Sequence, residues 1–196
     1  MTKQSERLFR NDFLESLTHV HPIVPLLFWS PLVFFLLWRS ATVLELPPGK
    51  IAAMAVPGLV VWTLAEYLLH RYVFHYRAKS SVGNRLVHLF HGVHHDRPND
   101  KSRLVMPPVG AVIIMSMLWL VFTLVIPAPW VEPFTAFFIT GYLMYDYTHY
   151  ATHHFPMKYP FLFALKRHHL QHHFTTEKAR FGVSSPLWDW VFGTMR

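Results

Sequence analysis

The chain has 196 residues, of which 52% are hydrophobic, and its mean hydropathy is +0.23, a composition typical of a membrane protein. It contains no cysteine, which excludes disulfides and thiolate metal sites. The net charge is +7, and the 15 histidines outnumber the 11 acidic residues. Whether the positive charge points to nucleic acid depends on how it is distributed along the chain.

The first segment, residues 1–22, is polar and lacks the apolar core of a cleavable signal. Its apolar positions Leu8, Phe13, Leu14 and Leu17 predict a short amphipathic helix. We therefore treat this segment as a unit that precedes the membrane domain.

Four apolar stretches follow, each near the length of about 20 residues that spans a bilayer. They cover residues 23–46, 51–74, 109–130 and 134–150. Proline-bounded links, LPPG at 46–49 and PAPWVEP at 127–133, force neighbouring spans to run antiparallel. The sequence predicts an all-α integral membrane domain over residues 23–196, a four-helix bundle made of two helical hairpins.

Basic residues occur before the first span, in the 76–108 segment and in the 151–196 segment, whereas the opposite side has only Arg39 and Lys50. By the positive-inside rule both termini and both of these segments are cytoplasmic, and the two segments form a helical cap. The charge pattern then reflects membrane topology, and we expect no nucleic-acid partner.

The histidines fall in four clusters that this topology places on one face of the membrane. Ten of them are the candidate metal ligands: His70, His75, His91, His94, His95, His149, His153, His169, His172 and His173. In HxxHH and HxxxH patterns, residues three and four apart share a helix face. His70 and His75 are about 140° apart on an ideal helix, so they serve different ions or the helix loosens at its end.

Ten neutral imidazoles are too many for one ion. Two ions with about five ligands each suit a metal that prefers five or six ligands, rather than a four-coordinate structural zinc. Iron is the metal whose redox chemistry would justify such a site. Zinc could still occupy it in a purified sample.

Acidic residues inside apolar stretches are costly and tend to be functional. Glu66 precedes His70 by four residues and Asp146 precedes His149 by three, so we expect each carboxylate to orient an imidazole through its free N–H. His88 is a third candidate partner for the ligand imidazoles. His168 falls off the shared helix face and is predicted to be solvated.

Four sequence segments resemble the membrane fatty acid hydroxylase superfamily, and within it the fatty acid 2-hydroxylase branch. They are EYLLHRYVFH, HLFHGVHHDRPNDKSRLVMPP, YDYTHYATHH and FGVSSPLWDWVFGT, between about residues 66 and 194. The resemblance implies four transmembrane helices capped by a cytosolic dimetal site, with two iron ions in the working enzyme and O2 as oxidant. It also implies a non-haem di-iron monooxygenase that hydroxylates C2 of a long acyl chain, in a fatty acid or a sphingolipid.

Fungal and animal members of that branch carry a cytochrome b5 domain, and these residues contain none. We therefore expect electrons from a separate partner, which would be a cytochrome b5-like protein, a ferredoxin or a reductase. The short form resembles bacterial or plant members, which favours a bacterial inner membrane, or the endoplasmic reticulum in a eukaryote.

Alternative functions remain open at this stage. A sterol or carotenoid oxidase or desaturase of the same superfamily would use the same metal chemistry. A histidine-rich metal transporter would hold its site near the membrane midplane rather than at one face. A membrane cytochrome needs two axial histidines per haem, and ten on one face exceed that number.

Overall fold

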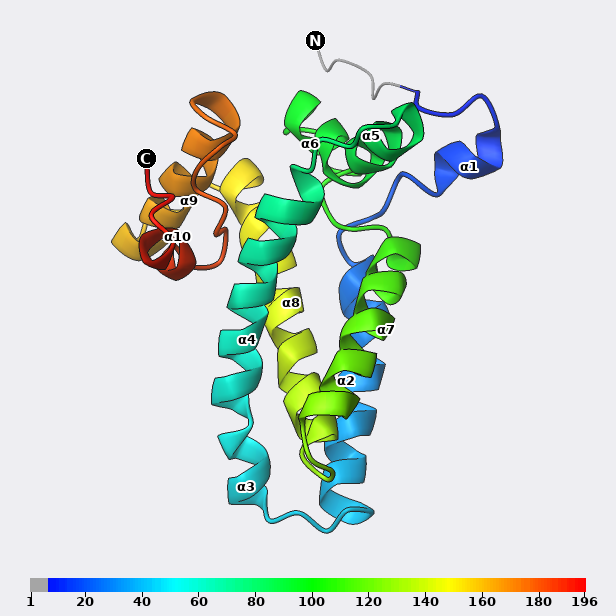
Figure 1. Cartoon of the computed structure of the whole chain (residues 1–196), viewed down its shortest axis with the longest axis vertical. Coiled ribbons are helices and arrows are strands. Elements are labelled where there is room, and N and C mark those ends of the chain that lie inside the picture. Colours follow the sequence, from blue (N-terminus) through cyan, green and yellow to red (C-terminus); the bar gives the residue numbers. More distant parts are fainter. Residues whose placement is uncertain (1–6) are drawn as a thin grey trace.

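The computed structural model describes residues 7–196, so the first six residues of the predicted 1–22 segment lie outside the described part of the chain. Every regular element that it describes is helical, which confirms the all-helical prediction. Long helices run side by side along one axis in Figure 1. They are α2 (Val24–Thr42), α4 (Ala55–Leu68) with α3 (Pro48–Ala53) before it and the π-helix η1 (Leu69–Phe74) after it, α7 (Pro108–Val125) and α8 (Val131–His154).

The remaining helices gather at one end of these long helices, and we call this end the cap (Figure 1). They are α1 (Asp12–Ser16), α5 (Ser81–Val87), the π-helix η2 (His88–Gly92), α6 (Val93–Asp96), α9 (Pro160–Phe174) and α10 (Leu187–Val191). The histidine-rich segments therefore lie at the same end as the C-terminus.

Three helical segments of the described chain are long and apolar enough to cross a membrane: Val24–Thr42, Pro48–Phe74 and Pro108–Val125. The fourth predicted span corresponds to α8, more than half of whose residues are buried inside the protein. Because α8 faces other helices rather than lipid, it accommodates polar side chains. The helix α7 ends at Val125, a few residues before the expected boundary near 130, because Ile126 is extended ahead of Pro127.

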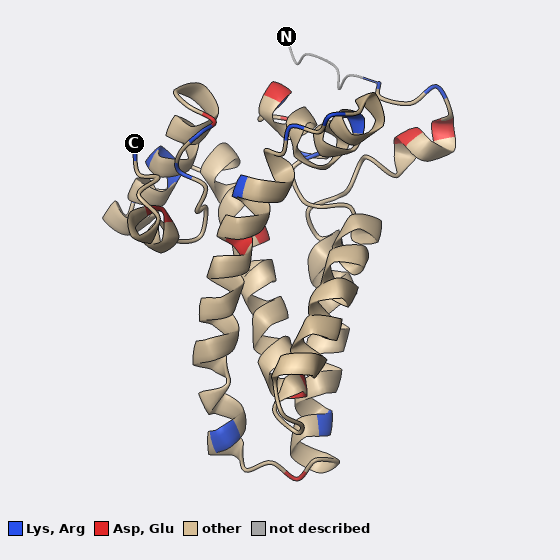
Figure 2. Ribbon diagram, viewed as in Figure 1, with Lys and Arg blue, Asp and Glu red and all other residues tan. Residues whose placement is uncertain are grey.

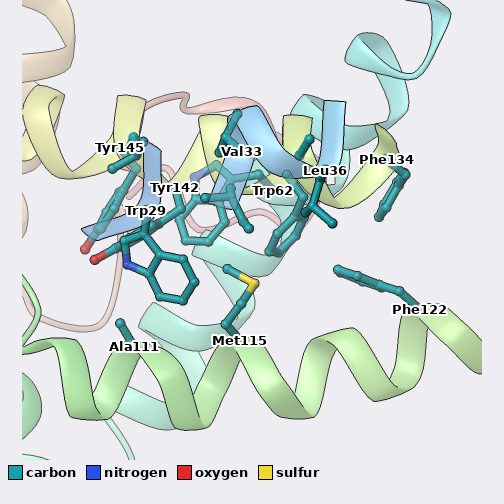
Figure 3. Packing of buried hydrophobic residues seen from close by; sticks show 14 of the residues in the cluster. Trp29, Val33, Leu36, Trp62, Ala111, Met115, Phe122, Phe134, Tyr142 and Tyr145 are labelled. Carbon is teal, nitrogen blue, oxygen red and sulfur yellow. The ribbon is translucent and has the colours of Figure 1, made fainter. Parts of the chain in front are cut away.

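Aromatic side chains fill the core between α2, α4 and α8 (Figure 3). The Trp62 ring lies 5.2 Å from Phe138 and 5.4 Å from Tyr142, centroid to centroid, and both pairs are edge-to-face. Trp29 of α2 contacts Tyr142 at 6.1 Å. Such pairs contribute about 0.5–1.5 kcal/mol each beyond the burial of their area. This packing fixes α4 against α8 and so sets where their cap ends lie.

Lys and Arg are concentrated at the cap, as Figure 2 shows. At the opposite end Arg39 pairs with Glu132 at 3.0 Å, which joins the end of α2 to the start of α8. The unequal distribution of Lys and Arg that the sequence predicts is therefore present in the structure, between the two ends of one bundle.

The N-terminal segment differs from its prediction. The helix α1 has five residues and starts after the Asn11 cap, and Leu8 lies outside it in irregular chain. The Glu15 carboxylate accepts hydrogen bonds from the backbone of Leu8 and Phe9 and pairs with the buried Arg103. The segment is thus folded back by polar contacts, which a short amphipathic pattern does not reveal.

Helices α4 and α8 approach closely at two glycines. A Cβ on Gly141 would lie 2.6 Å from the Cβ of Trp62, and one on Gly58 would lie 2.8 Å from the carbonyl oxygen of Phe134. Both distances are shorter than packed carbon and oxygen atoms tolerate, so these positions require glycine.

We expect Gly141→Ala to destabilise the protein by about 1–3 kcal/mol, because the added methyl group must displace α4. Thermal unfolding in detergent micelles measures the loss. Gly49→Ala is the matched control, since nothing lies within 4 Å of its Cβ, and it should leave the melting temperature unchanged or slightly higher. Equal effects of the two substitutions would contradict the close-packing account.

Candidate metal centre

The end of α4 changes to a π-helix where the first two candidate ligands lie. In η1 the backbone N–H of His75 donates to the carbonyl of His70, a spacing of five residues at 3.2 Å. Residues five apart then lie over each other, and the two imidazole centroids are 5.1 Å apart. Of the two alternatives that the sequence left open for His70 and His75, the structure therefore shows the second, a helix that loosens at its end.

The three histidines of each HxxHH motif do not all face the same way. His91 and His95 bring their Nε2 atoms to 3.0 Å, whereas His94, between them, faces His149 at 2.9 Å. On α9, His169 and His173 pair at 3.0 Å, and His172 faces His75 at 3.0 Å. Each motif therefore contributes ligands to two neighbouring groups.

The structure brings together all ten predicted candidates in two groups of five. Within each group the ligand nitrogen atoms all lie within 4.8 Å of one another. Group A is His70, His75, His91, His95 and His172, and group B is His94, His149, His153, His169 and His173. The groups are adjacent, since His95 of group A stacks on His173 of group B with centroids 4.1 Å apart. His154 belongs to neither.

The chemistry of these groups suits a cation. His70 and His172 donate hydrogen bonds from Nδ1 to backbone carbonyls, so the lone pairs of their Nε2 atoms point into group A. Converging lone pairs about 3 Å apart repel one another unless a positive ion lies between them. Burial also lowers the pKa of His75 and His172 to about 4 and that of His95 to about 3. These imidazoles are therefore neutral at pH 7, the form that binds metals.

Five imidazoles per group exceed the four ligands of a structural zinc site and fit a metal with five or six ligands. Imidazole nitrogen suits iron, zinc, copper and nickel alike. The residues present thus fit a dimetal centre, and the geometry of the donors does not by itself choose the metal.

The hydrogen-bond acceptors that orient the ligand imidazoles are not the carboxylates predicted from the sequence. Glu66 accepts hydrogen bonds from the backbone of Val183 and Ser184 rather than from an imidazole. The acceptor for Nδ1 of His70 is instead the carbonyl of Phe181, at 2.5 Å. Glu66 reaches across to the C-terminal segment because that segment lies against α4, a contact between residues far apart in the sequence.

Asp146 and His88 also make no hydrogen bond to the ligand imidazoles among the described residues. Asp146 is fully buried, yet Nδ1 of His149 has no hydrogen-bond partner among the described residues. The His88 side chain is 44% exposed and lies 3.8 Å from the Asp96 carboxylate, at the surface. Three- and four-residue spacing placed these groups near the ligands but did not fix their orientation.

Two residues of the site escaped sequence reasoning. His168 is buried rather than solvated, and its Nε2 lies 3.0 Å from the fully buried carboxylate of Asp189. The only signal available was an acid in the apolar WDWVFG stretch, which has no obvious local partner. Trp188 donates to Thr63 at 2.9 Å, so this stretch lies against α4.

An apolar cavity of about 420 Å³ reaches the metal centre from one side. His91, His94 and His149 line its inner end, and these come from both groups. Most of the remaining wall is apolar and includes Leu14 and Leu89, from the N-terminal segment and η2. A second, open depression of about 850 Å³ reaches His75, His91 and His95 from the protein surface.

This helical fold, with three candidate membrane helices, two histidine groups that could each hold a metal ion and an apolar cavity beside them, is the arrangement expected of a membrane metalloprotein. The chain belongs to the fatty acid hydroxylase family, whose sequence model matches residues 55–194. The match covers every candidate ligand in both groups.

Individual relatives narrow the comparison. The chain is 42% identical to the dihydroceramide fatty acyl 2-hydroxylase FAH1 of Arabidopsis thaliana, over 99% of this chain and 81% of the relative. It is 36% identical to the fatty acid 2-hydroxylase of Rattus norvegicus and 36% identical to the ceramide very long chain fatty acid hydroxylase SCS7 of Saccharomyces cerevisiae. It spans 56% and 50% of the length of those two relatives.

The fold also matches a solved structure described as full-length scs7p with only the hydroxylase domain visible. The TM-score is 0.89 at 36% identity, covering 95% of this chain and 70% of that one. The arrangement of the helices is therefore shared with a protein of the same family.

We expect His169→Ala to lower the metal content of the purified protein from two ions per chain towards one, because it removes a buried ligand of group B. Inductively coupled plasma mass spectrometry measures this content. His154→Ala, one residue beyond a ligand but outside both groups, should leave it unchanged. An equal loss in both variants would contradict the assignment of the groups.

Proposed function

We propose that this protein is a di-iron, O2-dependent monooxygenase that hydroxylates C2 of a long acyl chain, in a sphingolipid or a fatty acid. The observation that carries the proposal is the meeting of both histidine groups at the inner end of an apolar cavity. A hydrocarbon chain in this cavity lies beside the metal ligands, and attack on an unactivated C–H bond needs a cofactor because no side chain supplies the oxidant.

The protein's own residues then perform three tasks. The ten imidazoles hold two metal ions, and iron would supply the activation of O2. The apolar wall, with residues such as Leu89 and Val105, binds hydrocarbon and excludes water. Asp146 and Arg103 are charged members of a mostly apolar wall, and they favour binding of the polar end of the lipid on their side of the cavity.

The relatives support an acyl substrate. Their names give dihydroceramide, ceramide and fatty acid as what they hydroxylate. None of the observations favours the sterol or carotenoid alternative. Two groups of five imidazoles at one end of the bundle also argue against bis-histidine haem and against a transport site at the membrane midplane.

The proposal includes the membrane arrangement. Residues 23–196 form the hydroxylase domain, preceded by residues 1–22. The cap and the described part of that segment, residues 7–22, face the cytoplasm, since Lys and Arg gather there (Figure 2). Electrons come from a separate redox partner, which reaches group A through the open depression beside His75 and His95. The membrane is a bacterial inner membrane, or the endoplasmic reticulum in a eukaryote.

The test is mass spectrometry of total acyl chains from cells grown under 18O2 that express the protein or its His172→Ala variant. We expect 2-hydroxy acyl chains with one 18O atom only with the unchanged protein, because His172 is a fully buried member of group A. The host needs a verified reductase and a sphingolipid supply. Absence of labelled product in such a host would contradict acyl hydroxylation.

A second variant tests the cavity separately from the metals. Leu89→Trp fills part of the 420 Å³ space, so we expect at least a tenfold loss of 2-hydroxylated product with both metal ions retained. Val82→Trp, on the neighbouring helix α5 and 68% exposed, is the matched control and should keep its activity. Unchanged activity in Leu89→Trp would show that the acyl chain binds elsewhere.

A further inference from the structure

The segment from Ala179 to Ser184, which we call the strap, joins α9 to α10 and lies against the metal centre. Two of its backbone carbonyls accept hydrogen bonds from ligand imidazoles. Nδ1 of His172 donates to Ala179 at 2.7 Å, and Nδ1 of His70 donates to Phe181 at 2.5 Å. Both of these ligands belong to group A. Such bonds fix the tautomer and the ring orientation of a ligand and raise its basicity.

Asp189 of α10 holds the middle of the strap. Its carboxylate is fully buried and accepts from the backbone N–H of Phe181 at 2.8 Å and of Gly182 at 2.7 Å. It also accepts from the Thr194 hydroxyl at 2.7 Å and lies 3.0 Å from Nε2 of His168. The residue whose carbonyl orients His70 is thus itself fixed by Asp189.

Glu66 of α4 holds the far end of the strap. Its carboxylate accepts from the backbone N–H of Val183 at 2.5 Å and of Ser184 at 2.9 Å, and from the Ser184 hydroxyl. Glu66 lies one helical turn before His70, so the same helix carries a ligand and anchors the segment that orients it. Two buried carboxylates, one from α4 and one from α10, therefore hold a six-residue strap.

Gly182 is required for the clamp to close. A Cβ on this residue would lie 2.1 Å from the carbonyl oxygen of Ser185 and 3.0 Å from Oδ2 of Asp189. Any side chain would push the strap away from the carboxylate. The close approach of the strap to the Asp189 carboxylate therefore depends on the glycine as well as on the acid.

Group B has no comparable support. Nδ1 of His94, His149, His169 and His173 is buried without a hydrogen-bond partner among the described residues. In group A the corresponding atom of His95 is also unbonded, 3.7 Å from a Glu177 oxygen, but two of the five ligands are fixed by the strap. The two groups thus have the same number of imidazoles and a different degree of preorganisation.

We propose that Asp189 and Glu66 are positioning residues that act through the strap on group A alone, so that the two metal sites are unequal and group A binds its ion more tightly. This inference rests on the proposed function only in that both groups bind metal. Removal of an outer hydrogen-bonding partner of a metal ligand typically lowers metal affinity about 10- to 100-fold.

The experiment is a titration of the metal-free 196-residue chain in detergent with Co²⁺, in which calorimetry and the visible absorption of the bound ion report binding. We expect two classes of site in the unchanged protein, the tighter one lost in His70→Ala and the weaker one in His149→Ala. In Asp189→Asn the tighter class should weaken about 10- to 100-fold, with a changed absorption spectrum, while the weaker class keeps its affinity.

Glu132→Gln is the matched control, because it removes a partly buried, paired carboxylate at the opposite end of the bundle. It should change neither class. Ser184→Ala removes a single hydroxyl from the strap and provides a second variant if Asp189→Asn fails to fold; it too should weaken only the tighter class.

Equal weakening of both classes, or of neither, would overturn the role of the strap while leaving a dimetal enzyme intact. Assignment of the tighter class to group B by the His149→Ala variant would overturn it as well. A protein that binds no divalent metal in either group would overturn the proposed function along with the inference.

Discussion

The close contact between α4 and α8 determines where the rest of the molecule can lie. Gly58 and Gly141 let the two helices approach, and Trp62 fills the space beside them. The π-helix η1, which continues α4, carries His70 and is followed by His75, and the last turns of α8 carry His149 and His153. This single interface therefore sets the two sides of the metal centre. The segments 88–96 and 160–174 need only complete a cluster whose width is already fixed.

The sequence predicts which histidines meet but not how they divide. Spacing of three and four residues on a helix placed ten imidazoles on one end of a bundle, and the structure groups those same ten. His94 and His95 are consecutive, as are His172 and His173, and consecutive side chains on a helix point about 100° apart. Which group each side chain reaches depends on how the helices pack together, which local periodicity does not encode.

The partners of the ligands were harder to predict for a different reason. Backbone carbonyls orient His70 and His172, and every residue has a carbonyl, so no residue type marks them in the sequence. The acids in apolar stretches were a genuine signal, since Glu66 and Asp146 are both buried. The partners of Glu66 lie far along the chain, however, at Val183 and Ser184, and a helix-spacing argument assigned Glu66 to an imidazole on its own helix.

The two π-helical turns have a consequence for how metal sites are encoded in helices. An α-helix aligns side chains three and four positions apart, whereas η1 aligns His70 with His75 by adding one residue to a turn. If these residues wound as a regular α-helix instead, His70 and His75 would lie about 140° apart, and one ligand would leave the group although no histidine had been removed. The length of this turn is therefore as much a part of the ligand motif as the identity of its residues.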